Sequence, residues 1–348
     1  MQLIKPDINI NFISKRKIAF SISIAMIIIS FFSLIIHKGP KYGIDFAGGV
    51  LIQVKFNTPV NLDDVRSGLN ELELGKSSVQ EFGDKKDNEY LIRTDMSISS
   101  SQDFTSRVKK ALEYTTGNDV QIRRVEMVGP QVGKDLREKA LFAMFYALLF
   151  ITIYISGRFE LKWILSGIMA GALMVAVYLL SLFNVGVAFF ISAAVVVTLI
   201  LFWFLKLKYA MGAIVALIHD IIITVGIFSI CDKEFSLPII AALLTIIGYS
   251  LNDTIVVFDR IRENLRKYHK NTLEVVINKS INETLSRTIL TSLTTLFVVV
   301  TLFTLGGGII HDFAFAMIVG IIIGTYSSIY IASPILLAWQ KRGKKIRL

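Results

Sequence analysis

The sequence is poor in residues that build several common kinds of site. Its 348 residues include one cysteine, Cys231, so no disulfide can form within the chain and a thiolate metal site is not favoured. The phosphate-binding motif G-x-x-x-x-G-K-[ST] does not occur, which argues against a P-loop ATPase. We therefore expect no enzyme, no catalytic residue, no bound metal and no cofactor.

Charged residues are also scarce. They make up 18% of the chain while apolar residues make up 53%, against about 25% and about 45–50% in soluble domains. This balance is typical of a polytopic α-helical membrane protein, in which each spanning helix needs about 20 apolar residues. Eight runs reach this length, at residues 18–36, 138–157, 164–183, 185–205, 210–230, 237–258, 288–306 and 313–338.

The first apolar run could instead be the core of a signal peptide. It has 19 residues, whereas such cores have about 7–15. The stretch HKGPKYG that follows it contains no small-x-small cleavage site. We therefore interpret the run as a retained membrane span.

The net charge of +10 is unevenly distributed. Lysine and arginine are concentrated near the N-terminus, in a polar loop expected at 259–287 and in the tail. With eight spans these segments lie on one side, and the positive-inside bias places that side, with both termini, in the cytoplasm. The expected parts are a cytoplasmic segment with the first span (1–37), a domain on the opposite side (38–132), a helical bundle (133–340) and a basic tail (341–348).

The domain at 38–132 is predicted to be a small α+β fold. Strands are expected at 50–56, 78–82, 89–95 and 119–129, with helices at 62–74 and from Ser99 or Ser100 to about Tyr114; Asn61 can cap the first helix. This βαββαβ order is that of a ferredoxin-like sandwich. The near-neutral charge of the domain argues against a nucleic-acid partner. We interpret it as a binding or lever module, with His37 at its edge as an interfacial residue.

Three groups of polar residues interrupt the apolar runs. They are Asn252 with Asp253, His219 with Asp220, and Arg287 followed by Thr288, Thr291, Ser292 and Thr295 at helical spacing. A charged group at the centre of a bilayer costs about 2.5–3.5 kcal/mol on insertion scales, and such groups usually carry function. A buried carboxyl favours its neutral form and a nearby guanidinium favours the anion. A carboxyl between these influences can take up a proton on one side of a membrane and release it on the other.

Plainer interpretations stay open for some of these residues. Hydroxyls of the threonine stripe can bond to carbonyls of their own helix and pack against neighbouring helices. Arg287 can extend to the cytoplasmic surface, and His219 can be a hydrogen-bonded packing residue. Asp253 and Asp220 favour a functional interpretation because neither reaches water easily.

Five stretches of the sequence closely resemble the SecF family of bacterial protein-export membrane proteins. They are YGIDFAGG (42–49), VGPQVGKDLREKAL (128–141), ALIHD (216–220), GYSLNDTIVVFDRIRENLR (248–266) and NETLSRTILTSLTTL (282–296). The resemblance implies one half of an RND-like bundle in the inner membrane, with the domain at 38–132 in the periplasm. It implies that Asp253, Asp220, Arg287 and Asn252 lie on a proton path, supported by Thr288, Thr291 and Thr295.

The resemblance also implies partners and an energy source. The expected partners are SecD as a heterodimer, the SecYEG channel, YajC as a further candidate, unfolded preprotein at the periplasmic face and membrane lipid. The proton-motive force would promote late steps of translocation, after the SecA-driven step. Two rival hypotheses are half of an RND-type small-molecule exporter and a passive membrane scaffold or insertion chaperone.

One segment departs from the family pattern. Members of the family have six spans, whereas eight are predicted here. The excess is a two-helix hairpin at about 163–208, joined near Asn184. It contains no charge inside its apolar runs, so we expect it to face lipid or a partner.

Overall fold

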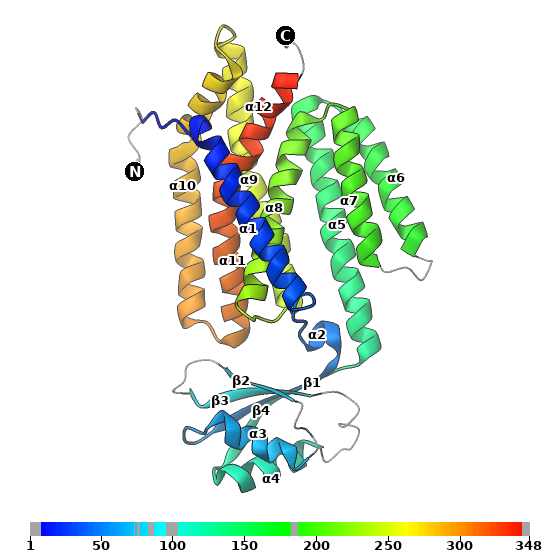
Figure 1. Ribbon diagram of the computed structural model, residues 1–348, viewed down its shortest axis with the longest axis vertical. Coiled ribbons are helices and arrows are strands. Elements are labelled where there is room, and N and C mark those ends of the chain that lie inside the picture. The colour runs from blue at the N-terminus through cyan, green and yellow to red at the C-terminus, as the bar shows by residue number, and fades with distance from the viewer. Residues whose placement is uncertain are drawn as a thin grey trace.

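A bundle of long helices carries a small α+β domain at one of its ends (Figure 1). The computed structural model describes residues 8–72, 74, 77–82, 87–94, 104–181 and 187–342. The chain enters the domain from the first long helix through a short helix, α2 (Ile44–Ala47), and leaves it directly into α5.

The domain has the predicted order of strands and helices. Its elements are β1 (Gly49–Phe56), α3 (Leu62–Asn70), β2 (Ser78–Phe82), β3 (Glu89–Thr94), α4 (Phe104–Thr116) and β4 (Val120–Val128). The sheet order is β2-β3-β1-β4 and all neighbours are antiparallel, which confirms the split βαβ arrangement. Helix α3 ends at Asn70 rather than at 74, and the predicted start of the second helix at Ser99 or Ser100 lies outside the described residues.

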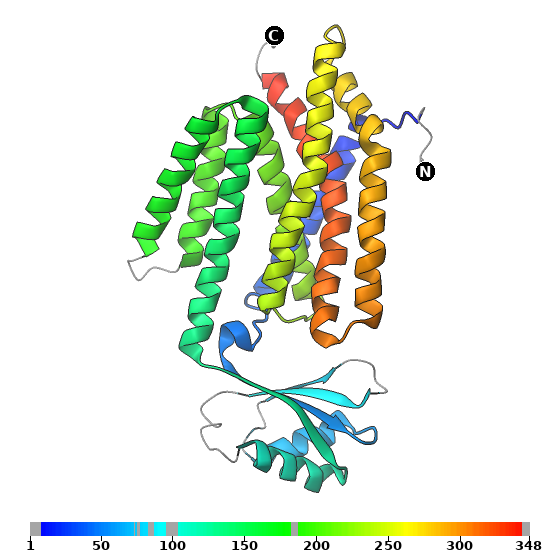
Figure 2. The same ribbon diagram turned by 180° about the vertical axis from the view of Figure 1, so that it is seen from behind.

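Helices α3 and α4 cover one face of the sheet, and the opposite face is turned toward the bundle (Figures 1 and 2). Alternate residues of β1, Val50, Ile52 and Val54, are fully buried beneath the helices, as the period of two in a strand requires. Asn61 begins α3 as expected, since its side chain accepts a hydrogen bond from the Asp63 amide at 3.3 Å.

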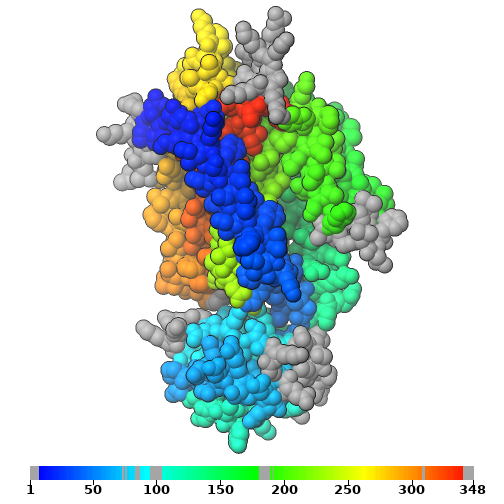
Figure 3. All heavy atoms as spheres, viewed as in Figure 1, coloured from blue at the N-terminus to red at the C-terminus, as the bar shows by residue number. Residues whose placement is uncertain are grey.

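The bundle contains the long apolar helices. They are α1 (Arg16–Ile36, after a 3₁₀ turn at Ile13–Lys15), α5 (Pro130–Glu160), α8 (Lys208–Ile230), α9 (Leu237–Lys267), α10 (Leu273–Leu305) and α11 (Gly308–Ser327), which continues through a π-helical turn (Ser328–Ala332) into α12 (Ser333–Arg342). Within the described residues these make six segments long and apolar enough to cross a membrane. Figure 3 shows α1 (blue) lying along the outside of the bundle.

The extra segment forms the predicted helical hairpin. Helices α6 (Trp163–Ser181) and α7 (Val187–Phe204) run side by side next to α5, at the edge of the bundle (Figures 1 and 2). Their described apolar stretches, Trp163–Leu179 and Ile191–Phe204, are shorter than those of the six long segments. That these two helices also cross the membrane stays a prediction, and the joint near Asn184 lies outside the described residues.

The polar connection expected at 259–287 is not a loop, and this expectation was wrong. Helix α9 continues to Lys267 and α10 begins at Leu273. The polar side chains bond across the helix pair, where Asn264 Nδ2 donates to Ser280 Oγ at 3.0 Å and to Glu283 Oε2 at 2.7 Å. These bonds add a polar contact to the apolar packing between the two helices.

The first and last described helices lie, relative to the domain, on the side that the charge pattern predicts for the termini. The start of α1, the turn between α9 and α10, and the end of α12 are all at the end of the bundle opposite the sheet (Figures 1 and 2). The basic segments thus share one side of the bundle and the α+β domain lies on the other.

Candidate site of buried carboxyl groups

Two carboxyl groups are buried between the central helices. Asp220 of α8 is 0% exposed and Asp253 of α9 is 2% exposed. Helices α9 and α11 approach closely here because Gly324 has no side chain: a Cβ atom there would lie 2.9 Å from the Ser250 Cβ. Small residues at helix contacts of this kind are typical of membrane bundles. The close approach brings hydroxyl groups within reach of both carboxyls.

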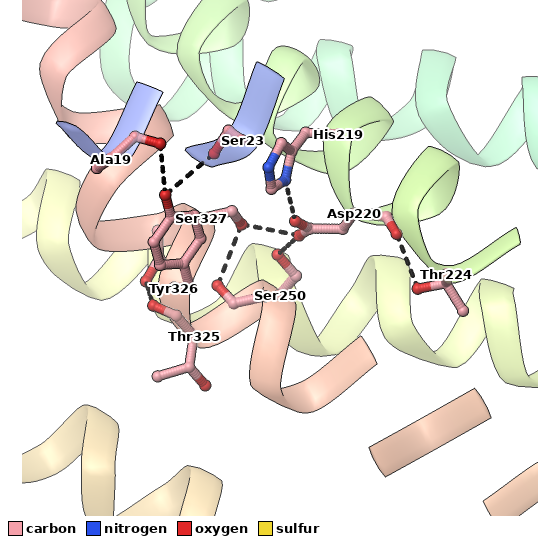
Figure 4. A network of polar contacts seen from close by, with 11 residues as sticks. Ala19, Ser23, His219, Asp220, Thr224, Ser250, Thr325, Tyr326 and Ser327 are labelled. Carbon is pink, nitrogen blue, oxygen red and sulfur yellow. Dashed lines mark hydrogen bonds and ion pairs between the residues drawn. The ribbon is translucent and has the colours of Figure 1, made fainter. Parts of the chain in front are cut away.

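Asp220 accepts hydrogen bonds from three helices (Figure 4). Ser250 Oγ of α9 and Ser327 Oγ of α11 both donate to its Oδ2 atom, at 2.6 Å and 2.8 Å. Its Oδ1 atom lies 2.9 Å from Nδ1 of His219, its neighbour on α8. A buried charge needs partners of this kind, so the site can hold Asp220 in its ionised form.

His219 connects this site to α1. Its ring lies 6.2 Å from that of Tyr326, and its Nε2 atom is buried without a hydrogen-bond partner among the described residues. Tyr326 donates its hydroxyl to the Ala19 carbonyl at 2.7 Å and lies 3.1 Å from Ser23 Oγ (Figure 4). Within the described residues, the histidine therefore makes one hydrogen bond and one ring contact.

Asp253 has fewer polar contacts than Asp220. Ser292 Oγ of α10 donates to its Oδ2 atom at 3.4 Å, which is a long bond. The same Ser292 hydroxyl lies 2.7 Å from Thr325 Oγ1 of α11. Ser250, Asp253 and Thr254 share one buried helix face, as their spacing indicated. The carboxyl is thus enclosed by protein and has a hydroxyl beside it.

Arg287 and Asn252 do not join Asp253 in this structure. Both side chains are exposed on the outside of the bundle, and within the described residues no ion pair links Arg287 to either carboxyl. The common role predicted for these residues from the sequence stays a prediction.

The threonine stripe of α10 mostly bonds to its own helix. Thr291 Oγ1 donates to the Arg287 carbonyl at 3.0 Å and Thr295 Oγ1 to the Thr291 carbonyl at 3.0 Å. Thr288 is buried and its hydroxyl has no partner among the described residues. Ser292, the fourth member of the stripe, is the one that contacts Asp253. The supporting role predicted for the three threonines is not tested by these contacts.

Sequence reasoning missed Thr325, Tyr326 and Ser327. The signal was a run of four hydroxyl-bearing residues, Thr325 to Ser328, inside the last apolar segment, but serine and threonine also pack helices without further function. No metal site competes with this interpretation: within the described residues, no three His, Cys, Asp or Glu side chains cluster so that they could hold a metal ion.

Comparison with known proteins identifies the family. The family model described as "Protein export membrane protein SecD/SecF, C-terminal" matches residues 107–188 and 181–342, and the "SecD/SecF GG Motif" model matches residues 33–60. The chain belongs to the SecD/SecF family. Among its relatives in this family, the protein translocase subunit SecF of Calditerrivibrio nitroreducens is 42% identical over 337 residues, which covers 96% of this chain and 95% of the relative. SecF of Vibrio alginolyticus is 41% identical, covering 97% and 91%.

Solved structures of SecDF resemble this SecD/SecF-family chain along nearly its whole length. The crystal structure of SecDF from Thermus thermophilus, titled a translocon-associated membrane protein, matches with a TM-score of 0.71 and 30% identity. SecDF in a super-membrane-facing form matches with a TM-score of 0.62 and 32% identity. Each match covers 98% of this chain but 40% of the SecDF chain. The likeness confirms the predicted fold class, an RND-like helical half-bundle with a small α+β domain, in a multi-pass membrane protein.

Proposed function

We propose that this chain is an accessory subunit of the bacterial Sec translocase in the inner membrane. With SecD it would use the proton-motive force to promote late steps of preprotein translocation, after SecA-driven transport through SecYEG. One observation carries the proposal: Asp253 is a carboxyl buried inside a membrane-spanning helix, in a chain 42% identical to a subunit named for protein translocation.

The surroundings of Asp253 suit a group that changes its charge. A carboxyl away from water favours its neutral form, while its Ser292 neighbour can donate to the anion or accept from the acid. Neither charge state therefore lacks a partner. One elementary charge that crosses 100 mV releases about 2.3 kcal/mol, and this energy is available to move helices. The proposed energy source is the proton gradient, and no cofactor takes part.

The outer face of α9 and α10 supports the proposed partnership with SecD. In the most apolar stretch of α10, 17% is buried, against 61% in that of α8. Most of the α10 surface is therefore open to lipid or to a partner protein. Arg287 and Asn252 are exposed on this part of the bundle. A guanidinium in contact with lipid is costly, whereas a partner subunit can supply an opposite charge. SecD is the proposed occupant, with contacts to SecYEG and YajC elsewhere on the assembly.

The proposed orientation follows from the charge pattern and the fold together. The basic segments lie at one end of the bundle and the α+β domain at the other. With the basic end in the cytoplasm, residues 38–132 lie in the periplasm, where unfolded preprotein emerges. In this arrangement proton transfer at Asp253 would move or hold the periplasmic domain.

The decisive experiment measures preprotein transport into inverted inner-membrane vesicles that contain SecYEG, SecD and this chain. Wild type, Asp253→Asn and Arg287→Met are compared with and without a proton gradient. We expect the gradient to stimulate wild-type transport, and both variants to lose that stimulation while they still copurify with SecD. Asp259→Asn is the matched control, because it removes from the same helix a half-exposed carboxyl that pairs with Arg158 instead of lying between the central helices.

The possible outcomes separate the rival functions. A passive scaffold would support transport equally well with Asp253→Asn as with wild type at every gradient, and that result would overturn the proposal. A small-molecule exporter would show gradient-driven efflux of small compounds and no effect on preprotein. Loss of transport in the Asp259→Asn control would point to damaged folding instead of lost proton transfer.

A further inference from the structure

Three consecutive residues of α11 contact three different helices. Thr325 Oγ1 lies 2.7 Å from Ser292 Oγ of α10, and Ser327 Oγ donates to Asp220 Oδ2 of α8 at 2.8 Å. Between them, the Tyr326 hydroxyl bonds to α1 (Figure 4). Successive residues of an α-helix point about 100° apart because a turn has 3.6 residues. One short segment therefore lies against both carboxyl sites.

The hydroxyl groups beside Asp253 have too few protons for all their acceptors. Ser292 carries one hydroxyl proton and faces two acceptors, Asp253 Oδ2 at 3.4 Å and Thr325 Oγ1 at 2.7 Å. Thr325 also carries one, and its acceptors are Ser292 Oγ and the Ile321 carbonyl at 2.8 Å. A hydroxyl donates one bond at a time. The chain of bonds therefore has two possible directions.

The charge of Asp253 selects the direction. When Asp253 is an anion, Ser292 donates to it and Thr325 donates to Ser292. When Asp253 is protonated, it can donate to Ser292, which then donates to Thr325, and Thr325 donates to the Ile321 carbonyl of its own helix. A change of charge on α9 is thus converted into a changed bond on α11.

Ser327 makes a similar choice at the other carboxyl. Its single proton can go to Asp220 Oδ2 at 2.8 Å or to the Gly324 carbonyl at 3.1 Å. An anionic Asp220 holds the first bond, and a protonated Asp220 favours the second. Both choices are made within one turn of the same helix, so each affects the position of the other hydroxyl.

The helix is irregular at this point. The π-helical turn Ser328–Ala332 follows Ser327 directly, and Ser333 Oγ donates to the Ser328 carbonyl at 2.9 Å. Helix α8 accommodates the wider turn at Gly212, where a Cβ atom would lie 2.9 Å from the Ala332 carbonyl oxygen. π-turns often occur at functional sites. Such a turn can take up a small shift of α11 without breaking the helix.

We propose that Thr325 and Ser327 of α11, with Ser292 of α10, couple the two buried carboxyl groups, so that the protonation of one changes the other. These three are positioning residues, since they act through Asp253 and Asp220. The inference rests on the proposed function, in which Asp253 exchanges protons. Among the described residues, the helices around this segment contribute further titratable or charged groups: His219 on α8, Tyr249 on α9, Tyr326 and Tyr330 on the last helical segment, and the exposed Arg287 on α10.

The coupling is measured with dicyclohexylcarbodiimide, an apolar reagent that modifies protonated carboxyl groups. The labelling rate of Asp253 is followed by mass spectrometry at fixed pH, in the complete complex with SecD. We expect Asp220→Asn to change this rate about threefold or more, as is typical of residues that share one network. In the Thr325→Val background, which removes the hydroxyl but keeps the shape, Asp220→Asn should have no effect.

Two further variants make the test specific. Thr325→Ser keeps the hydroxyl and should restore the effect of Asp220→Asn. Thr301→Val is the matched control, because the Thr301 hydroxyl bonds to the Phe297 carbonyl of its own helix, and it should leave the effect intact. Each variant is checked by copurification with SecD and by thermal unfolding.

The labelling test stands apart from the transport test. If Asp220→Asn changes the labelling of Asp253 by the same factor with and without the Thr325 hydroxyl, or does not change it at all, the coupling is overturned. Gradient-driven transport by Asp253→Asn at the wild-type level would instead overturn the proposed function. The two failures are therefore distinguishable.

Discussion

Arg93 of β3 forms an ion pair with Glu234, which lies in the loop between α8 and α9. The pair joins the α+β domain to the helix bundle, and the side chains are 22% and 8% exposed. Burial lowers the pKa of Arg93 to about 10, which still leaves the guanidinium charged at neutral pH. A second bond close by, from the Leu237 amide to Asp45 Oδ2 at 2.9 Å, attaches the first residue of α9 to α2.

Neutralising Glu234 is expected to loosen the domain. Glu234→Gln removes the carboxylate that pairs with Arg93 and leaves only the more distant influence of Asp312 and Asp45. Breaking a fully buried pair costs about 3–5 kcal/mol, which is an upper bound here. The domain should then populate undocked positions. The distance between two spin labels is measured by double electron–electron resonance. One label is attached to the native Cys231, which is exposed, and the other to Tyr114→Cys on α4, where Tyr114 is 82% exposed. A narrow distance distribution in wild type should become broad in the variant.

The same loop offers a matched control. Asp232 pairs with Lys41 at 2.7 Å, but these side chains are 70% and 36% exposed. Exposed pairs contribute about 0–1 kcal/mol, so Asp232→Asn should leave the distribution narrow. Equal widths for wild type and Glu234→Gln would show that the buried pair does not hold the domain.

The glycine pair at the entrance of the domain is expected to tolerate no side chain. Gly48 and Gly49 have φ angles of +78° and +124°, and a Cβ atom would lie 2.8 Å from the Pro130 Cα at Gly48 and 2.7 Å from the Thr94 carbonyl oxygen at Gly49. Strained backbone of this kind costs about 1–3 kcal/mol per residue, and the close contacts add to it. Gly48→Ala and Gly49→Ala should each lower the midpoint of thermal unfolding in detergent, measured by circular dichroism.

Gly39 separates the effect of backbone strain from the effect of close contacts. It also has a positive φ, +112°, but no atom lies within 4 Å of the position a Cβ would take. Gly39→Ala therefore introduces backbone strain alone and should lower the unfolding midpoint less than Gly49→Ala. If both variants lower it equally, close packing at the entrance contributes nothing.

Local signals explain why the domain and most spans could be predicted. The alternation of Val50, Ile52 and Val54 reports a strand buried on one face, and Asn61 marks a helix start through a bond to a residue two positions on. Long apolar runs report membrane helices by length alone. Each of these signals is contained in a few neighbouring residues, so the sequence displays it directly.

The contacts of the site could not be predicted because they depend on distant segments. Whether Thr325 and Ser327 face the buried polar groups or lipid depends on how α11 packs against α9 at Gly324, and this packing has no local signal. The segment around Asn264 was mistaken for a loop because it is rich in charged residues, whereas its bonds and apolar contacts join two helices. The same holds for Arg93 and Glu234, which the sequence does not link.

Two asparagines of α10 are expected to hold the N-terminal segment in place. Asn278 Oδ1 accepts a bond from the Phe12 amide at 2.9 Å, and Asn282 Oδ1 accepts one from the Ile10 amide at 2.8 Å. Both side-chain amides also donate to the Ile10 carbonyl. The double variant Asn278→Ala/Asn282→Ala removes every one of these bonds. Hydrogen–deuterium exchange of a peptide covering residues 8–15 should become faster.

A third asparagine serves as the control for these two hydrogen-bonding asparagines. Asn271 is exposed in the turn between α9 and α10, and Asn271→Ala should leave exchange over 8–15 unchanged. The single variants Asn278→Ala and Asn282→Ala should each give an intermediate exchange rate, because the remaining asparagine still binds the segment. Exchange at the wild-type rate in the double variant would mean that packing of the segment, rather than the amides, protects it.

Excision of the α6–α7 hairpin is expected to leave the rest of the bundle folded. The ends of the hairpin are already joined, since Lys162 Nζ donates to the Leu205 carbonyl at 2.7 Å and the Tyr209 amide donates to Glu160 Oε1 at 3.0 Å. A short glycine linker in place of 164–204 can therefore connect α5 to α8. Lipid chains are as apolar as the lost helices and can cover the exposed side of α5. Copurification with SecD and thermal unfolding should stay near wild type. Removal of 163–181 alone is the control. A single remaining helix would make α8 start from the wrong end of the bundle, so this deletion should abolish folding. If both deletions abolish folding equally, the hairpin is an integral part of the bundle.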